Sequence, residues 1–288
     1  MIKSIAGFLK TVITPSDWIP HIKRNKGFYL LLFSFMFFRH FFYSYNMIPS
    51  SSMVPTLIPG DQVTVDKTEY NVMLPFFNVP IFNIKEPSVG DIVTFYKEFN
   101  GQDIYMVKRV VAVAGDEIRF EGNKIYVNGK NLGHKNIPNF NNGLEKMIVN
   151  HHYQNDDWYK QCLAEEERTG PYRKALWIEK CHKRYIGRYK FYDVKDYNGN
   201  EHVIAYSPLE EIENEKKISH LTMTSKPMTI PEGKIYVIGD NRNDSFDSRF
   251  WGFLDVDKVV GKVDRVMFNY EDLKHDIYGD QRYWKKIK

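Results

Sequence analysis

Three polar segments of the chain carry side chains that could perform nucleophilic catalysis. The first holds three consecutive serines, Ser50, Ser51 and Ser52, between Pro49 and Pro55, and prolines restrict the backbone around them. A serine hydroxyl becomes a good nucleophile only when a neighbouring base removes its proton. A serine-rich linker is the commoner explanation of such a cluster, so the base has to be sought elsewhere in the chain.

The second segment supplies a candidate base. Lys108 and Arg109 interrupt an otherwise apolar, β-branched run, and the alternation of a strand directs one of the two side chains inward. An inward lysine is unfavourable unless it is paired or neutral, and a neutral lysine is a competent general base. Holding it neutral at pH 7.5 costs about 4 kcal/mol from a reference pKa of about 10.4, which desolvation can supply. The alternative is a lysine that faces solvent or a carboxylate.

The third segment, from Gly239 to Gly252, concentrates polar and charged residues in a glycine-bounded loop after a predicted strand. Loops of this kind often carry function. The ordinary interpretation is a solvated turn whose shape is held by an ion pair between Asp247 and Arg249. No histidine lies in any of the three segments, so a Ser-His-Asp relay is poorly supported.

The elements expected to position these segments are mostly strands. Short β-branched runs separated by glycine-containing turns predict strands at 62–66, 91–97, 104–113, 117–120, 124–127, 234–238 and 258–268. Asn128-Gly129 is the signal of a hairpin turn. The stretch from 131 to 226 changes character and contains helical spacing. We therefore predict a mainly β fold: an antiparallel β catalytic domain with an inserted α+β subdomain.

The amino-terminal part predicts a single transmembrane helix at residues 28–45. An uncharged run from Phe28 to Phe38 follows several basic residues, and aromatic residues extend it to roughly 18 residues if Arg39 reaches the interface. A buried core helix would leave the basic flank unexplained, and a cleaved export signal would lack a small-residue cleavage site. Basic residues precede the run, and none occurs between Arg39 and Lys67. This bias predicts that residues 1–27 are cytoplasmic and that the remainder faces outward.

Composition bounds the remaining classes of function. The chain of 288 residues is 43% hydrophobic and has a formal net charge of +4 from scattered basic residues, so no nucleic-acid footprint stands out. Cys162 and Cys181 lack zinc-ligand spacing, and we expect neither a metal nor another cofactor. A single disulfide between these two cysteines is possible but not required.

Two further segments could contact lipid. The apolar stretch 72–82 is predicted either to dip into the outer leaflet or to fold back as a core loop. The carboxyl-terminal tail is expected to lie on lipid headgroups or to be solvated, and its aromatic and basic residues are Tyr283, Trp284, Lys285, Lys286 and Lys288.

Together the three polar segments closely resemble those of the bacterial type I signal peptidases, also called leader peptidases, which are Ser/Lys dyad serine proteases. The family has Pro-Ser-x-Ser-Met-x-Pro-Thr-Leu after the anchor, a Lys-Arg-Val-Val-x-x-x-Gly-Asp strand and a Gly-Asp-Asn-Arg-x-x-Ser-x-Asp-Ser-Arg-x-Trp-Gly loop. All three occur here in that order, and the resemblance covers about 48–128 and 230–268. Two positions depart from the pattern: Ser51 replaces the usual glycine, and Asn243-Asp244 inverts the commoner Asp-Asn order.

The resemblance implies a role for individual residues of this chain. Ser52, which precedes Met53, is the expected nucleophile, Lys108 the general base, and Ser51 is excluded as a nucleophile. The hydroxyl of Ser50 would complete an oxyanion hole with the Ser52 backbone amide. The expected supporting residues are Ser245, which would orient Lys108, and the ion pair of Asp247 and Arg249.

The implied activity is removal of N-terminal signal peptides from exported precursor proteins by a membrane-anchored serine endopeptidase through an acyl-enzyme. Its partners would be those precursors and membrane lipid, with no nucleic acid, at the inner (plasma) membrane. The predicted catalytic domain comprises 46–130 and 227–288, interrupted by the subdomain at 131–226. Two rival classes are a cytoplasmic Ser-Lys autoprotease fused to a DNA-binding module, which the anchor opposes, and a non-enzymatic membrane scaffold.

Overall fold

The computed structural model describes residues 21–74, 79–122, 124–133, 135–138, 189–206, 226–269 and 282–287. The regular secondary structure of these residues is mainly antiparallel β-sheet, as the sequence predicts. The helical elements are α3 (Lys26–Phe42), α8 (Ser248–Trp251) and the 3-10 helix η4 (Val256–Lys258). The strands up to the predicted insertion are β1 (Tyr43–Met47), β2 (Asp61–Asp66), β3 (Asn71–Leu74), β4 (Val79–Asn83), β5 (Ile92–Phe99), β6 (Gln102–Ala112), β7 (Glu117–Glu121) and β8 (Lys124–Val127). The later strands are β9 (Lys130–Asn131), β10 (Lys135–Asn136), β11 (Lys190–Lys195), β12 (Glu201–Tyr206), β13 (Met228–Thr229), β14 (Lys234–Ile238), β15 (Leu254–Asp255), β16 (Val259–Asn269) and β17 (Lys285–Lys286).

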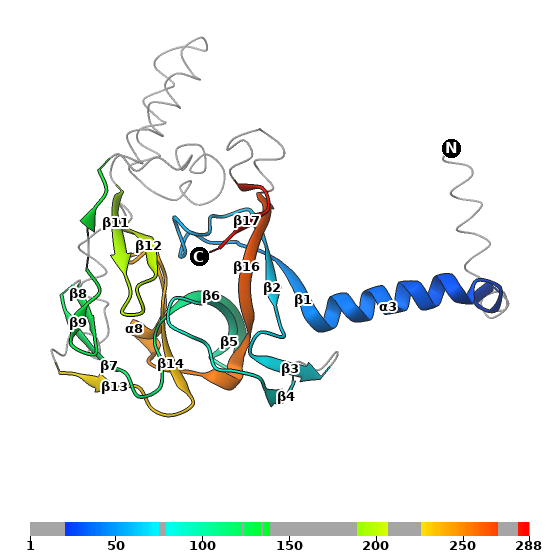
Figure 1. The fold of residues 1–288 in the computed structure, drawn as a ribbon, viewed down its shortest axis with the longest axis horizontal. Helices are drawn as coiled ribbons and strands as arrows, with labels where there is room; N and C mark the ends of the chain where they lie inside the picture. The colour runs from blue at the N-terminus through cyan, green and yellow to red at the C-terminus, as the bar shows by residue number, and fades with distance from the viewer. Residues whose placement is uncertain are drawn as a thin grey trace, which may run out of the picture.

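An eight-stranded sheet lies at the centre, in the order β1-β2-β16-β5-β6-β14-β15, with β17 paired to β16 (Figure 1). Strand β6 therefore lies between β5 and β14. In this register Val93 is opposite Lys108, and Ile238 is opposite Arg109. Because β14 ends at Ile238, the loop that begins at Gly239 starts beside the strand that carries the candidate base.

Smaller sheets surround the central one among the described residues. They have the orders β13-β7-β8-β9, β10-β11-β12 and β3-β4. Strands β8 and β9 are joined by Asn128 and Gly129, whose φ values of 51° and 75° are those that a two-residue hairpin turn requires. The predicted hairpin signal is therefore confirmed at this position.

Buried apolar side chains cover both faces of β6. On one side, Val110 packs in a cluster with residues of β5 and β14. On the other, Val111 packs with Val194 of β11 and Ile204 of β12, so the described part of the predicted insertion rests on the central sheet. The expectation that only one side chain of the Lys-Arg pair turns inward is wrong, because both faces of this strand are covered.

Helix α3 differs from the predicted helix at 28–45. It ends at Phe42, because Tyr43 and Tyr45 belong to β1 and pair with Asp66 and Thr64 of β2. Several of its apolar side chains are exposed, including Leu31 at 70%, which does not fit the alternative of a buried core helix. In Figure 1 the helix projects away from the sheets. Within the described ranges, no helix is both long enough and apolar enough to span a bilayer.

Parts of the predicted organisation lie outside the described residues. These parts are 139–188 and 207–225 of the inserted subdomain, with Cys162 and Cys181, and the tip of the apolar loop at 75–78. The backbone on either side of that tip forms the β3-β4 hairpin. In the tail, the side chains of Tyr283 and Trp284 are exposed, and the two lysines that follow form β17.

Candidate active site

The serine segment is a tight turn fastened at its two ends. The backbone N–H of Ile48 donates to the carbonyl oxygen of Asp61 at 2.8 Å, so the chain enters and leaves the turn at the same place. Met53 and Leu57 are fully buried in a cluster with residues of β2 and β16. Burial of these side chains fixes the turn on the sheet and leaves Ser52 partly exposed beside it.

The structure brings Ser52 and Lys108 together. The Nζ atom of Lys108 lies 2.8 Å from the Oγ atom of Ser52 and donates a second hydrogen bond to the carbonyl oxygen of Val107 at 2.9 Å. Lys108 is only 3% exposed. Burial lowers its pKa to about 8, against the opposing effect of Asp247 and with a smaller contribution from Arg249. A fraction of this amine is therefore unprotonated at neutral pH and can accept the serine proton.

Ser50, the predicted oxyanion-hole residue, lies near this pair. The Ser50 and Ser52 hydroxyl oxygens are 3.4 Å apart, which is longer than a strong O–H···O bond. The Ser50 hydroxyl is therefore close enough to Ser52 to donate to a negatively charged oxygen that forms beside it during acyl transfer.

A buried ion pair joins β6 to the loop after β14. Arg109 Nε and Nη2 donate to the two carboxylate oxygens of Asp240 at 2.9 and 2.8 Å, and both side chains are at most 2% exposed. Burial acts to raise the pKa of Asp240, but the charge and hydrogen bonds of Arg109 hold it below its usual value. Such a bidentate pair fixes geometry more than it stabilises the fold. Sequence reasoning assigned neither residue a role, although Arg109 adjoins Lys108 and Asp240 lies in the matched loop.

The predicted ion pair between Asp247 and Arg249 is present. Arg249 Nε donates to Asp247 Oδ1 at 2.8 Å, and the backbone N–H of Gly239 donates to Asp247 Oδ2 at 2.9 Å. Burial acts to raise the pKa of Asp247, and Arg249 with the hydrogen bonds holds it below its usual value. The carboxylate therefore stays charged and organises the loop from inside.

Ser245 lies in this loop, and its hydroxyl makes no hydrogen bond to the Lys108 amine. Its hydroxyl donates to Asp247 Oδ2 at 2.7 Å, whereas the Lys108 amine is engaged by Ser52 and Val107. Ser245 is thus linked to Lys108 through the Asp247 carboxylate, whose charge raises the lysine pKa.

Gly239 allows the loop to approach Ser52, a role that sequence reasoning did not assign. A Cβ atom at this position would lie 2.5 Å from the carbonyl oxygen of Ser52 and would overlap the hydroxyl of Ser245. Only glycine permits so close an approach of backbone to backbone. Two residues later, the backbone N–H of Asn241 donates to the carbonyl oxygen of Ser52 at 3.0 Å.

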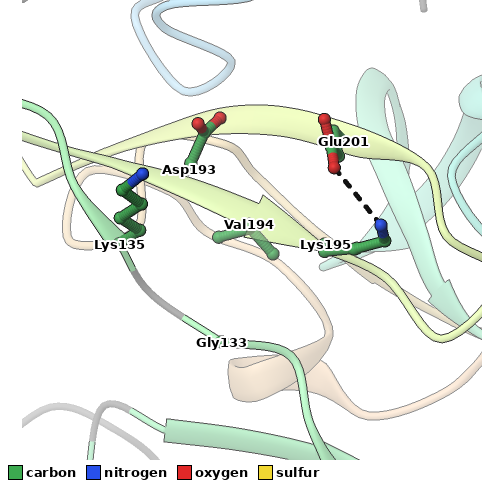
Figure 2. A pocket seen from close by; sticks show the side chains of 6 residues that line it. All are labelled: Gly133, Lys135, Asp193, Val194, Lys195 and Glu201. Atoms are coloured by element: carbon green, nitrogen blue, oxygen red, sulfur yellow. Dashed lines mark hydrogen bonds and ion pairs between the residues drawn. The ribbon is translucent and has the colours of Figure 1, made fainter.

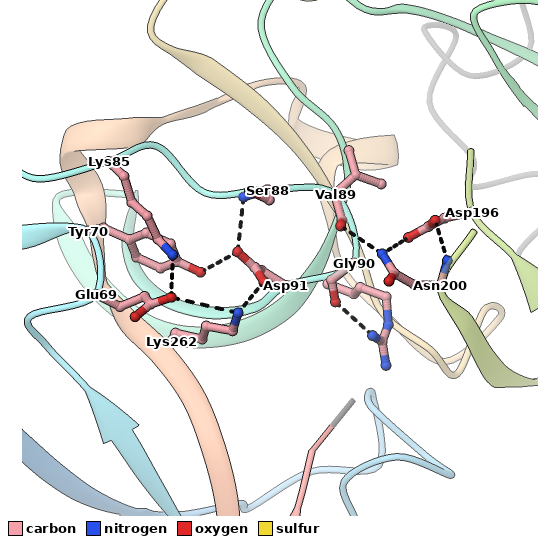
Figure 3. Close-up of polar contacts among 11 residues, drawn as sticks. Glu69, Tyr70, Lys85, Ser88, Val89, Gly90, Asp91, Asp196, Asn200 and Lys262 are labelled. Atoms are coloured by element: carbon pink, nitrogen blue, oxygen red, sulfur yellow. Dashed lines mark hydrogen bonds and ion pairs between the residues drawn. The ribbon is translucent and has the colours of Figure 1, made fainter. Parts of the chain in front are cut away.

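Polar contacts surround Gly90 and Asp91, which precede β5 (Figure 3). Arg109 Nη1 donates to the carbonyl oxygen of Gly90 at 2.8 Å. The neighbouring Asp91 accepts from the hydroxyl of Tyr70 at 2.8 Å and pairs with Lys262 of β16 at 2.5 Å. The segment before β5 is thereby tied to both β6 and β16, which limits movement of the strand that carries Lys108.

A hollow of about 500 Å³ lies on the β10-β11-β12 sheet (Figure 2). None of the predicted site residues lines it, and Lys195 pairs across it with Glu201 at 3.3 Å. Lys135 and Asp193 complete a lining of balanced charge, which offers no preference for a charged ligand. Within the described ranges, no group of three or more His, Cys, Asp or Glu residues could hold a metal ion.

An antiparallel β fold in which a serine hydroxyl lies against a buried lysine amine is characteristic of a serine peptidase. The family model described as "Signal peptidase, peptidase S26" matches residues 22–268. The chain therefore belongs to the signal peptidase family S26, whose members cleave signal peptides. This assignment sets aside both the DNA-binding autoprotease and the non-enzymatic scaffold.

Curated relatives agree with the family assignment. A signal peptidase I of Buchnera aphidicola subsp. Schizaphis graminum is 29% identical over 253 residues, 83% of this chain and 72% of the relative. The signal peptidase I of Pseudomonas aeruginosa is 26% identical over 264 residues, 88% of this chain and 74% of the relative. A solved signal peptidase I from Enterococcus faecalis is 23% identical to this chain, with a TM-score of 0.27. The match covers 62% of this chain and 98% of the solved one.

Proposed function

We propose that this signal peptidase cleaves its precursors with Ser52 as the nucleophile and Lys108 as the general base. The observation that carries the proposal is the distance of 2.8 Å between the lysine Nζ and the serine Oγ, at an amine that is 3% exposed. Burial supplies the lowered pKa that a lysine needs to act as a base near neutral pH.

The proposed reaction has two acyl-transfer steps. Lys108 takes the hydroxyl proton as Ser52 Oγ attacks the scissile carbonyl, and the proton then passes to the departing amine as the peptide bond breaks. A water molecule, deprotonated by the free lysine amine, then hydrolyses the ester and releases the signal peptide. The Ser50 hydroxyl and the Ser52 backbone N–H would stabilise the oxyanion in both steps.

The supporting residues act through the shape of the site. The ion pair of Asp247 and Arg249, together with the hydrogen bonds to Gly239 and Ser245, would keep the loop against the nucleophile. We propose that Ser245 orients Lys108 indirectly, through the charged Asp247.

We propose further that residues 28–42, the helical part of the predicted anchor, hold the chain in the inner (plasma) membrane with residues 1–27 in the cytoplasm. The support is the exposed apolar surface of α3, with Phe28, Leu30 and Phe33 all more than 60% exposed, and the basic residues that precede it. The catalytic β-sheets and the subdomain at 131–226 would then lie on the outer side, where exported precursors present their signal peptides. Membrane lipid is thus the second proposed partner.

A serine-reactive acylating probe tests the assignment of the nucleophile. The full chain in detergent should be labelled in the wild type and in Ser88→Ala, a control at an exposed serine, but not in Ser52→Ala. Ser52→Ala should also abolish cleavage of a precursor with a small residue at its cleavage site. Undiminished labelling of Ser52→Ala would place the nucleophile elsewhere.

Protease protection tests the proposed topology. A tag before Lys3 should be shielded from protease added outside the inner membrane, whereas a tag after Lys288 should be digested. The reverse pattern would contradict both the orientation and the access to exported precursors.

A further inference from the structure

The two positions at which the sequence departs from the signal peptidase pattern contact each other. Ser51 stands where the family usually has glycine, and its hydroxyl donates to Oδ2 of Asp244, which stands where the commoner order has asparagine. Glycine has no hydroxyl to donate, so the pattern with glycine cannot make this hydrogen bond. The two departures therefore form one structural unit across 193 positions of sequence.

We infer that Ser51 and Asp244 are a positioning pair that holds the Ser52 hydroxyl against Lys108. The inference rests on the proposed roles of Ser52 and Lys108 and adds two residues to that site. Ser51 is the chain neighbour of the nucleophile, and Asp244 lies in the loop that carries the ion pair of Asp247.

Asn241 connects the pair to the backbone of the nucleophile. Its Nδ2 atom donates to the carbonyl oxygen of Ser51 at 3.2 Å and approaches Oδ2 of Asp244 at 3.3 Å. Its backbone N–H donates to the carbonyl oxygen of Ser52 at 3.0 Å. One fully buried asparagine thus holds two consecutive carbonyl groups of the serine segment, and the Asp244 carboxylate orients the amide of that asparagine.

The charge of Asp244 strengthens this arrangement. A hydrogen bond to a carboxylate is about twice as strong as one between neutral groups, and Ser51 is only 7% exposed, so water competes little for it. An asparagine at 244 would keep the shape of the side chain but lose that strength. Misplacement of a reacting group by about 1 Å can lower the rate about 10²-fold, so a smaller displacement of the Ser52 hydroxyl should already lower kcat.

Asp244 also acts on the lysine itself. Burial lowers the pKa of Lys108, and the Asp244 charge is one of three carboxylates that oppose this effect. Removing that charge therefore lowers the pKa of Lys108 further and moves the acid limb of the rate profile to lower pH. Removing the Ser51 hydroxyl leaves the charge in place, so the two substitutions have different signatures.

A double-mutant cycle with Ser51→Ala, Asp244→Asn and the combined variant tests the pair on the full chain in detergent. Each single variant should lower kcat about tenfold with KM within about twofold, and the combined variant should be no slower than the slower single variant. The acid limb should move to lower pH in both variants that contain Asp244→Asn, and stay in place in Ser51→Ala. Controls at exposed positions, Ser88→Ala and Asp257→Asn, should keep wild-type kcat and profile.

Three outcomes would refute the role of Ser51 and Asp244 as a positioning pair. Wild-type kcat in either single variant, losses that multiply to about a hundredfold in the combined variant, or an unmoved acid limb in Asp244→Asn would each do so. If Ser51→Ala unfolds at lower temperature, Ser51→Gly replaces it in the cycle, since glycine is the residue that the family pattern usually has at this position. Ser52→Ala separates the two levels of inference, because residual cleavage in that variant contradicts the proposed nucleophile, whatever the pair variants do.

Discussion

Replacing Lys108 by arginine tests the proposed base most directly. Arginine keeps the positive charge and much of the reach of lysine, but it retains its proton at every working pH. A lysine that serves only as an ion-pair partner would be partly replaced by arginine. We therefore expect Lys108→Arg to be as inactive as Lys108→Ala, because neither can accept the proton of Ser52.

The wild-type rate should follow the titration of this amine. With a pKa of about 8, the amine is neutral in about 1% of molecules at pH 6, about 9% at pH 7 and about 90% at pH 9. An amine with the ordinary pKa of about 10.5 would be neutral in only about 0.03% at pH 7. The rate should therefore rise about tenfold from pH 6 to pH 7 and level off near pH 9.

The same burial predicts an effect on stability. The pKa of Lys108 is lower in the folded chain than in the unfolded chain, so the unfolded state binds more protons between pH 8 and pH 10.5. Lys108 therefore destabilises the fold by about 3 kcal/mol below pH 8, and this penalty disappears as the pH rises to 10.5. Lys108→Met should raise the free energy of unfolding more at pH 7 than at pH 10.5.

The rate profile is obtained by measuring precursor cleavage by the full chain in detergent. The substrate is saturating, and the pH is varied from 6 to 10. Lys124→Arg, at an exposed lysine of β8, is the matched control and should keep the wild-type profile. A tenth of the wild-type rate in Lys108→Arg would refute the assignment of the base. So would an acid limb centred near pH 6.5, as for a histidine, that persists in Lys108→Ala.

Three further substitutions probe the surroundings of the dyad. Ser50→Ala should lower kcat about 10²-fold with KM little changed in steady-state assays, and an unchanged kcat would remove Ser50 from the oxyanion hole. Gly239→Ala should abolish cleavage because its Cβ would lie 2.5 Å from the Ser52 carbonyl oxygen, and wild-type activity would contradict this close approach. Arg282 forms an ion pair with Asp61, and both side chains are at most 3% exposed. Arg282→Ala should lower the free energy of unfolding by about 3 kcal/mol or more in denaturant titrations, because it leaves the Asp61 carboxylate buried without its ion-pair partner. The exposed Lys286→Ala should change it by less than about 0.5 kcal/mol, and equal effects of the two variants would refute the buried pair.

The strands were predictable because their signals are local. A β-branched run such as that of β6 and a turn pair such as Asn128-Gly129 act over a few residues, so their positions can be found without knowledge of the fold. The burial of both Lys108 and Arg109 could not be found in this way. It depends on β11 and β12, which pack on the second face of β6. The alternation of residues within β6 does not indicate that another sheet packs there.

Contacts between distant parts of the chain were also missed. Arg282 is buried in the tail, where the sequence suggested only lipid contact or solvation, and its Nε donates to Asp61 Oδ1 at 3.0 Å. A second guanidinium nitrogen donates to the carbonyl oxygen of Thr56, within the serine segment, at 3.2 Å. The tail thus helps to hold the turn that carries the proposed nucleophile, Ser52. These partners lie more than 200 positions apart, and no periodic pattern connects them.

The choice among the three serines shows why residue type alone does not define a nucleophile. All three hydroxyls have the same chemistry, but each has a different environment. The Ser51 hydroxyl donates to Asp244, and the Ser50 hydroxyl oxygen lies 3.4 Å from that of Ser52. Only Ser52 lies within 2.8 Å of an amine whose pKa burial has lowered. Reactivity here follows from the partner that the fold supplies, so the serine excluded as a nucleophile can still determine the rate by fixing the one beside it.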